Sequence, residues 1–186
     1  MLLALDISTS CTGWCVLSNE NELLGIGFIN LSKHTGLYEK ASKVKTELLY
    51  LTVLYPFRKV VVEENLQAFR PGLSSAKTLM TLAQFNGVIR WICHSDLNTE
   101  VESINVNTAR KTAGIKIDRK SKKKTKEQVW EWVKVINNSD QIKIQWPYKT
   151  LKSGPNKGKI RLCNEAFDVA DAYVIGKSYF LLKNDE

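Results

Sequence analysis

The sequence contains only two histidines and four cysteines in 186 residues, and no two cysteines have the C-x-x-C spacing. We therefore expect neither a metal site built from histidine or cysteine nor a disulfide framework. The cysteines are expected to be reduced packing residues, which predicts a cytoplasmic protein. Any metal ion would be held by oxygen donors, and these suit Mg²⁺ or Mn²⁺.

Long apolar runs are missing as well. No uncharged apolar stretch reaches the length needed to span a bilayer, so no membrane partner is expected. The N-terminal apolar run has no basic region before it and is interrupted by Asp6, which is not typical of a signal peptide. With 44% apolar and 25% charged residues, the composition is that of a globular protein, and the length suits a single domain over residues 1–186.

Acidic residues are in the minority, with 19 Asp and Glu against 27 Lys and Arg and a net charge of +8. Residues 110–126 carry nine basic residues against a single acidic one, Asp118. This basic loop favours a nucleic-acid partner, although a solvated flexible loop has the same composition. A second segment, the Gly/Lys-rich insert 141–162, is typical of a hairpin or a mobile loop. The residues of the basic loop that we expect to bind DNA phosphates are Arg110, Lys111, Lys122, Lys123 and Lys124.

The apolar pattern predicts an α/β protein with a mixed central sheet of about five strands and helices on both faces. Thr125 and Gln128 have the spacing of a capping box, which predicts a helix start near residue 125. Strands are predicted at residues 2–7, 13–18, 23–31, 59–65 and 100–107, and helices at 38–54, 75–94, 108–113, from 125 onward and at 164–182.

Carboxylates follow two of the predicted strands and share one face of the last helix. Asp6 ends the first strand, and either Glu63 or Glu64 ends the central strand. Asp168 and Asp171 are three residues apart, so they project from the same side of their helix. Taken singly, each has a structural explanation as a turn cap or a solvated charge. Together, at strand ends where ligands gather, they predict an acidic cluster that needs cations to offset its repulsion. Two divalent ions about 4 Å apart would make it a phosphodiester-cleaving site.

Three motifs appear in a specific order along the chain: "ALDISTSCTGWCVL", "VVVEEN" and "DVADAYVIG". With them the chain resembles the RuvC family of Holliday-junction resolvases, which have the RNase H-like fold. The resemblance implies that Asp6, Glu63, Asp168 and Asp171 are catalytic residues that hold two Mg²⁺ ions, with Mn²⁺ as a substitute. The segment "TKEQVWEWV" is similar to the one that supplies a basic residue near the scissile phosphate, which is Lys126 here.

The resemblance implies a metal-dependent endodeoxyribonuclease that resolves four-way DNA junctions by paired phosphodiester hydrolysis. Such an enzyme would be a homodimer, because a two-fold axis supplies two matched sites. The alternative is a nuclease of the same type that cuts flaps, forks or other branched DNA. In the loop after the acidic strand, Phe69 and Arg70 are predicted to bind DNA, with Phe69 stacking on an unpaired base; the alternative is that Phe69 packs into the local core.

The chain also departs from the family pattern. Ile7-Ser8 stands where the family usually has Pro-Gly, and the 141–162 insert is longer and more basic than expected. Both departures are consistent with a divergent, phage-encoded member acting in the cytoplasm of a bacterial host.

Sugar kinases and actin-like ATPases also begin with a strand, an aspartate and a Thr-rich turn, but this chain is short for two lobes and has no second glycine-rich loop. Another alternative is a DNA-binding relative that has lost its nuclease activity. Such a loss would most simply replace one of the four acids, and all four are present here.

Overall fold

A five-stranded mixed sheet forms the centre of the computed structural model, which describes residues 1–64 and 75–184. The strand order is β3-β2-β1-β4-β5, with the first three strands antiparallel and β1, β4 and β5 parallel. The strands are β1 (Leu2–Ile7), β2 (Cys11–Leu17), β3 (Leu23–Asn30), β4 (Lys59–Glu63) and β5 (Glu100–Ile104). The predicted fold class is therefore confirmed.

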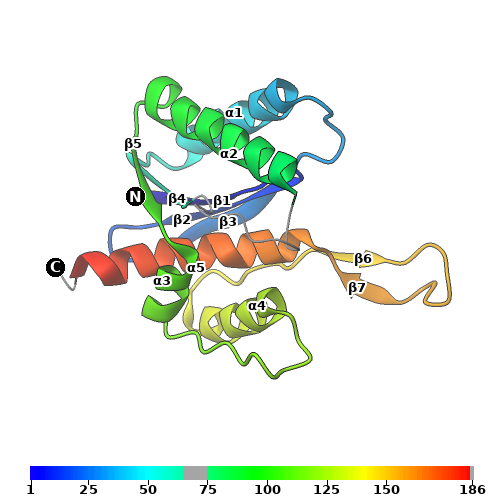
Figure 1. Ribbon diagram of the computed structural model, residues 1–186. Helices are drawn as coiled ribbons and strands as arrows, with labels where there is room; N and C mark the ends of the chain where they lie inside the picture. Colours follow the sequence, from blue (N-terminus) through cyan, green and yellow to red (C-terminus); the bar gives the residue numbers. More distant parts are fainter. Residues whose placement is uncertain (65–74, 185–186) are drawn as a thin grey trace.

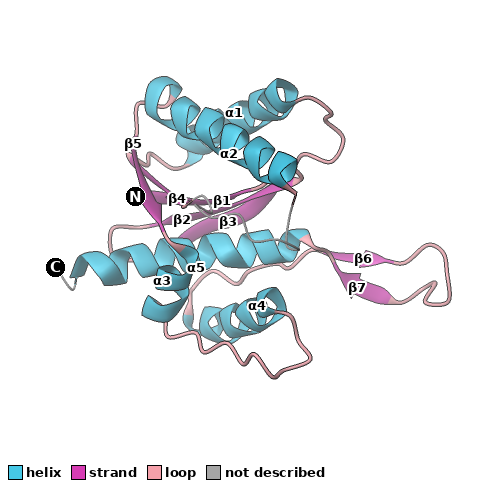
Figure 2. Ribbon diagram, in the orientation of Figure 1, coloured by secondary structure: helices cyan, strands magenta, loops and turns pink. Residues whose placement is uncertain are grey.

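Helices cover both faces of this sheet (Figures 1 and 2). One face carries α1 (Leu37–Leu54) and α2 (Ala76–Trp91), and α2 continues into a short π-helical turn, Ile92–Asp96. The other face carries the long α5 (Glu165–Asn184), and α3 (Val106–Thr112) and α4 (Thr125–Ile136) pack against α5. A short 3-10 turn, Asn137–Ser139, follows α4. No helix of the described residues is both long and apolar enough to cross a membrane.

The alternation of side chains along the strands assigns each residue to one of two cores. In β1, Leu3 and Leu5 pack with α1 and α2, whereas Leu2 and Ala4 pack with α5. Because successive strand residues point to opposite faces, Asp6 falls on the α5 face. In β4 the same rule groups Val61 with α5, so Glu63 also falls on the α5 face.

Helix α5 approaches the sheet closely because two glycines remove side chains from the contact. A Cβ atom on Gly13 of β2 would lie 2.1 Å from the backbone carbonyl oxygen of Asp168. A Cβ on Gly176 of α5 would lie 2.9 Å from Leu17 and 3.1 Å from Ala4. The backbone of α5 therefore rests on β1 and β2 at both points, and this position places Asp168 beside β2.

Several predicted boundaries shift for identifiable reasons. Strand β5 ends at Ile104 rather than at residue 107, because the Asn105 side chain accepts a hydrogen bond from the Asn107 N–H at 3.0 Å and starts α3. Helix α4 begins at Thr125 as predicted, but the expected capping residues are wrong by one position. The Glu127 carboxylate accepts the backbone N–H of Lys124 at 2.8 Å, and Gln128 bonds to the backbone of the preceding loop instead.

Part of the 141–162 insert forms a two-stranded hairpin, one of the two forms expected for it. The hairpin pairs β6 (Tyr148–Thr150) with β7 (Ile160–Leu162) in antiparallel register. It extends away from the central sheet, beside the start of α5 (Figure 1). The hairpin and the N-terminal end of α4 therefore flank the beginning of α5.

The contact at Gly13 gives a stability prediction. The substitution Gly13→Ala should lower the free energy of unfolding by about 1–3 kcal/mol, because the new methyl group collides with a helix backbone that cannot rotate away. Chemical denaturation of both proteins measures the difference. Gly87→Ala is the matched control, since Gly87 lies in α2 with nothing within 4 Å of its would-be Cβ. It should stabilise the protein by about 0.5–1 kcal/mol. Equal effects of the two changes would contradict the assigned contact.

Candidate metal-binding and active site

The four predicted carboxylates meet at the carboxyl ends of two neighbouring strands. Asp6 and Glu63 follow the paired residues Leu5 and Val62 of the parallel strands β1 and β4. Asp168 and Asp171 lie on α5, which covers the same face of the sheet. Each of the other three acids interacts electrostatically with Asp6, so the structure brings all four together.

Burial and mutual repulsion change the protonation of this cluster. Burial raises the pKa of Asp6 well above its usual range, and the charges of Asp171, Glu63 and Asp168 raise it further. Burial also raises the pKa of Glu63, and it raises that of Asp168 to about 6. The Asp6 and Glu63 side chains also share a hydrogen bond, which raises the pKa of Asp6 and lowers that of Glu63. In the absence of cations, the cluster retains protons that isolated carboxyls would have lost.

Arg110 binds directly to one of the four acids. Its Nη2 lies 3.0 Å from Oδ1 of Asp171, and the two side chains are only 19% and 15% exposed. The guanidinium opposes the effect of burial on the pKa of Asp171, which is still raised. Arg110, which we expected to bind DNA phosphates, lies within α3, and α3 is held to α5 where the Ser178 hydroxyl donates to the Ala109 carbonyl at 2.8 Å. The structure therefore places Arg110 inside the acidic cluster.

Lys126 lies where the sequence motif predicts a basic residue, beside the cluster. Its ammonium nitrogen is 4.4 Å from the centre of the Phe167 ring, and Phe167 directly precedes Asp168. The charge of Lys126 acts to lower the pKa of both Asp168 and Asp171, although burial outweighs it at both. The start of α4 thus carries a positive charge to the edge of the acidic cluster.

The choice between Glu63 and Glu64 is decided by strand alternation. Glu63 points to the α5 face and bonds with Asp6, whereas the Glu64 carboxylate accepts a hydrogen bond from the Asn105 side chain at 3.3 Å. The backbone N–H of Glu64 also donates to Ile104, which extends the β4–β5 pairing by one residue. Glu63 is therefore the member of the cluster.

The β1–β2 turn that follows Asp6 contains contacts that the sequence did not reveal. The Ser8 hydroxyl donates to the Cys11 carbonyl at 2.6 Å and closes the turn tightly. Lys40 of α1 donates its ammonium to the Thr9 carbonyl at 2.7 Å, which adds a cation near the site. The buried Cys11 thiol hydrogen-bonds to Asp168, and burial raises the pKa of this thiol. A lysine on an amphipathic helix and a cysteine in a strand give no sequence signal for these contacts.

The remaining predicted DNA-binding residues have different positions. Those with exposed side chains are Lys111, Lys122, Lys123 and Lys124. Lys123 forms an ion pair with Glu131 at 2.6 Å, and Lys124 precedes α4 as its N-cap residue. Phe69 and Arg70 lie outside the described residues.

The four carboxylates supply only oxygen donors, which are the ligands that Mg²⁺ and Mn²⁺ prefer. Within residues 1–64 and 75–184, however, no three acidic, cysteine or histidine side chains are arranged as ligands of one ion. Two contacts engage members of the cluster: Asp6 and Glu63 share a hydrogen bond, and Oδ1 of Asp171 is bound by Arg110. The chemistry of the donor set, four carboxylates, fits a divalent cation.

The raised pKa of Asp168 gives a pH prediction. A folded-state pKa of about 6, above the ordinary value of 3.8, means that the folded protein holds this proton more tightly than the unfolded chain. The stabilisation that this tighter proton binding contributes is present below pH 3.8 and is lost as the pH rises through 6. In EDTA, the unfolding free energy of the wild type should therefore fall with rising pH over this interval. Asp168→Asn should make this slope shallower, by at most about 1.4 kcal/mol per pH unit. Denaturation of both proteins at several pH values measures it, and parallel curves would contradict the assigned shift.

No protein-family model matches this sequence, and no curated protein matches it significantly. Several solved structures resemble the chain, and three of them are described here. The first is RuvC of Thermus thermophilus in complex with a Holliday junction substrate, with 14% sequence identity, 99% of this chain and 94% of that chain covered, and a TM-score of 0.66. The second is a structure of Thermus thermophilus RuvC, with 14% identity, 99% and 95% coverage and a TM-score of 0.59.

The third is the yeast mitochondrial Holliday junction resolvase Ydc2, with 13% identity, 98% of this chain and 78% of that chain covered, and a TM-score of 0.56. At such low identities the likeness establishes architecture rather than activity. It agrees with the strand order and with the helices on both faces of the sheet. The chain therefore has the RNase H-like fold of the RuvC structures, as the three sequence motifs predicted.

Proposed function

We propose that this protein is a Mg²⁺-dependent endodeoxyribonuclease that resolves four-way DNA junctions. The observation that carries the proposal is the convergence of Asp6, Glu63, Asp168 and Asp171 at one edge of the sheet, where burial raises the pKa of each. Buried like charges are costly for folding, and such clusters are characteristic of functional sites. The fold shared with a RuvC structure bound to a Holliday junction substrate supports the choice of DNA as substrate.

The chain's own residues have distinct roles in this proposal. Asp6 and Glu63 would hold cations from two rigid strands, while Asp168 and Asp171 complete the ligand set from α5. Two bound divalent ions, with Mn²⁺ able to substitute for Mg²⁺, would supply an activated water and stabilise the leaving oxygen. Cation binding would compete with the Asp6–Glu63 hydrogen bond and with the pairing of Arg110 and Asp171. The released guanidinium is then available to a DNA phosphate, which reconciles its position with the expected DNA contact.

Basic residues around the cluster would hold the DNA backbone. Lys126 is the nearest candidate for the scissile phosphate, because its charge already acts on Asp168 and Asp171. The exposed lysines before α4 would bind phosphates farther along the strand. Such contacts supply affinity and salt dependence rather than sequence recognition.

A homodimer is part of the proposal, because resolution of a four-way junction requires two matched cuts. The α1 and α2 side of the molecule supports it through exposed apolar residues. Tyr38, Met80 and Trp91 are 78%, 64% and 65% exposed, and Tyr38 and Trp91 line a groove between the two helices. Exposed aromatic and methionine side chains of this kind are typical of protein interfaces.

Cleavage of a labelled four-way junction, beside matched duplex, flap and fork, tests the proposed function. The wild type in Mg²⁺ should introduce paired symmetric nicks in the junction, and EDTA should abolish them. Asp6→Asn should lower the rate by on the order of 10³-fold or more while junction binding is retained, because a ligand and a repulsive charge are removed together. Asp96→Asn is the matched control, since Asp96 pairs with Lys45 on the opposite side of the sheet.

Undiminished cleavage by Asp6→Asn would refute the metal site. Equal cutting of flaps or forks would keep the nuclease and replace the junction assignment with the alternative of a general branched-DNA nuclease. Binding without cleavage in either Mg²⁺ or Mn²⁺ would leave a DNA-binding protein with this fold.

The lysines before α4 give a second prediction. Replacing Lys122, Lys123 and Lys124 together with alanine should weaken junction binding and reduce the slope of log K against log salt by about one unit for each phosphate that is no longer bound. Titrations at several salt concentrations measure this slope. If the slope is unchanged, these residues belong to a solvated loop that does not contact DNA.

A further inference from the structure

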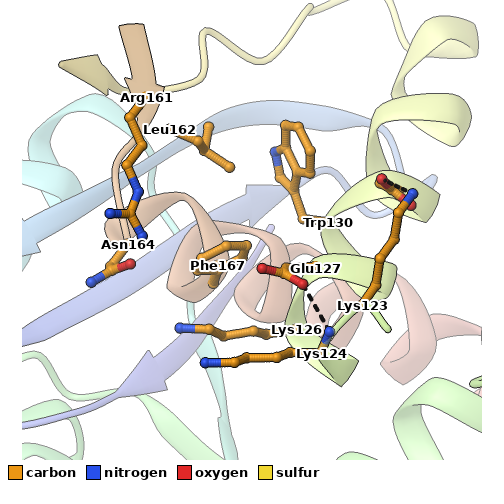
Figure 3. Close-up of a pocket in the computed structure, with 10 residues that line it drawn as sticks. Lys123, Lys124, Lys126, Glu127, Trp130, Arg161, Leu162, Asn164 and Phe167 are labelled. Atoms are coloured by element: carbon orange, nitrogen blue, oxygen red, sulfur yellow. Dashed lines mark hydrogen bonds and ion pairs between the residues drawn. The ribbon is translucent and has the colours of Figure 1, made fainter. Parts of the chain in front are cut away.

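A groove lies between the N-terminal part of α4 and strand β7 of the hairpin, with the start of α5 as its floor (Figure 3). Its volume is about 590 Å³. Lys124 and Lys126 extend along one side, and Arg161 and Asn164 stand on the other, with Phe167 between them. The groove is therefore built by the start of α4 and by a distant stretch that runs from β7 into α5, and this stretch includes the end of the insert whose role the proposed function leaves open.

The acidic and basic residues that line this groove differ in how far they are paired within the protein. Both acidic residues that line it are already engaged: Glu127 accepts the backbone N–H of Lys124, and Glu131 pairs with Lys123. In the part of the chain that the structure describes, no carboxylate forms an ion pair with Lys124, Lys126 or Arg161. Four basic residues and two acidic residues therefore line the groove, and this excess of positive charge favours an anionic ligand.

The floor of the groove is apolar and aromatic. Phe167, Leu162 and Trp130 are half-buried there, and Figure 3 shows them between the two basic sides. A surface that binds phosphates alone has no need of such side chains. A deoxyribose or a base presents the apolar faces that they match, and aromatic contact with bases is a common mode of binding to single strands. Cationic sides with an apolar floor therefore match a whole nucleotide rather than an isolated phosphate.

The groove adjoins the acidic cluster. Phe167 directly precedes Asp168, and Lys126 lies over the Phe167 ring while its charge acts on Asp168. A strand whose phosphate reached the cluster would pass Lys126 and enter the groove with its next nucleotides. Helix α5 fixes this relation, because Phe167 of the groove floor and the two aspartates all belong to its first turns.

We propose that this groove binds the cleaved DNA strand next to the scissile phosphate. Arg161 and Lys124 bind its phosphates, the apolar floor contacts a sugar or base, and the β6–β7 hairpin acts as a DNA-binding arm. The proposal deepens the proposed function and rests on it. It assigns a role to Arg161, a residue that belongs to none of the sequence motifs.

Junction binding in EDTA, where no cleavage is expected, tests the groove directly. Arg161→Ala should weaken binding by about tenfold and reduce the salt slope by about one unit, because one phosphate is no longer bound. Arg161→Lys should keep the slope, since it keeps the charge. Lys157→Ala is the matched control: Lys157 is an exposed residue of the same hairpin and does not line the groove. It should change neither quantity.

Neutral phosphates locate the contact along the strand. Methylphosphonates placed one at a time on either side of the cleaved bond remove single charges from the DNA. At one or two of these positions the substitution should cost the wild type about tenfold in affinity and cost Arg161→Ala nothing further, because the arginine that binds this phosphate is already absent. If the cost is the same for both proteins at every position, the strand does not lie in the groove.

Equal effects of Arg161→Ala and Lys157→Ala would also overturn the proposal, because the hairpin would then contribute only diffuse charge. Either failure leaves the proposed nuclease intact when Asp6-dependent cleavage is still observed. A wild-type protein that neither binds nor cuts junctions would instead refute the proposed function itself, and the groove assignment with it.

Discussion

The close contact between α5 and β2 at Gly13 is the constraint on which the candidate site depends. Because Gly13 has no side chain, the backbone of Asp168 lies directly against β2. A Cβ atom on Gly13 would be only 2.1 Å from the Asp168 carbonyl oxygen. This contact determines how far α5 stands from the sheet and which residues of its first turns face β1 and β4. The distance between the helix aspartates and the strand carboxylates is therefore set by the close packing of the two backbones rather than by any attraction among the acids.

The resulting cluster is unfavourable by itself, and its neighbours reduce the repulsion in three ways. Asp6 and Glu63 share a hydrogen bond, Arg110 pairs with Asp171, and Lys126 contributes positive charge at the edge of the cluster. Each contact can be exchanged, because a divalent cation can take the place of a proton, a guanidinium or an ammonium beside a carboxylate. Structural ion pairs are usually satisfied permanently, whereas this arrangement leaves a concentrated negative charge available to a stronger partner.

The two faces of the sheet also present different surfaces. The α5 side combines the acids with basic residues from α3, α4 and the hairpin, which is the charge pattern of our proposed DNA-binding surface. The α1 and α2 side pairs charges with one another, as in Lys43–Glu47 and Lys45–Asp96, and it also exposes Tyr38, Met80 and Trp91. A nuclease that binds DNA on one face and a second copy of itself on the other would use both. The sheet keeps the two surfaces apart because α1 and α2 never reach the face that α5 covers.

Local chemistry by itself determined the elements and the order of the acids. Short apolar runs defined the strands, helical spacing defined α1, and the carboxylates at strand ends were visible as departures from an apolar pattern. Which of Glu63 and Glu64 joins Asp6 depended on which sheet face α5 covers, and only the tertiary structure decided that. The same holds for Arg110 on Asp171, Lys40 on the turn and Arg161 at the groove. These contacts join residues distant in sequence, and no local periodicity encodes them because their partners are selected by how the layers pack.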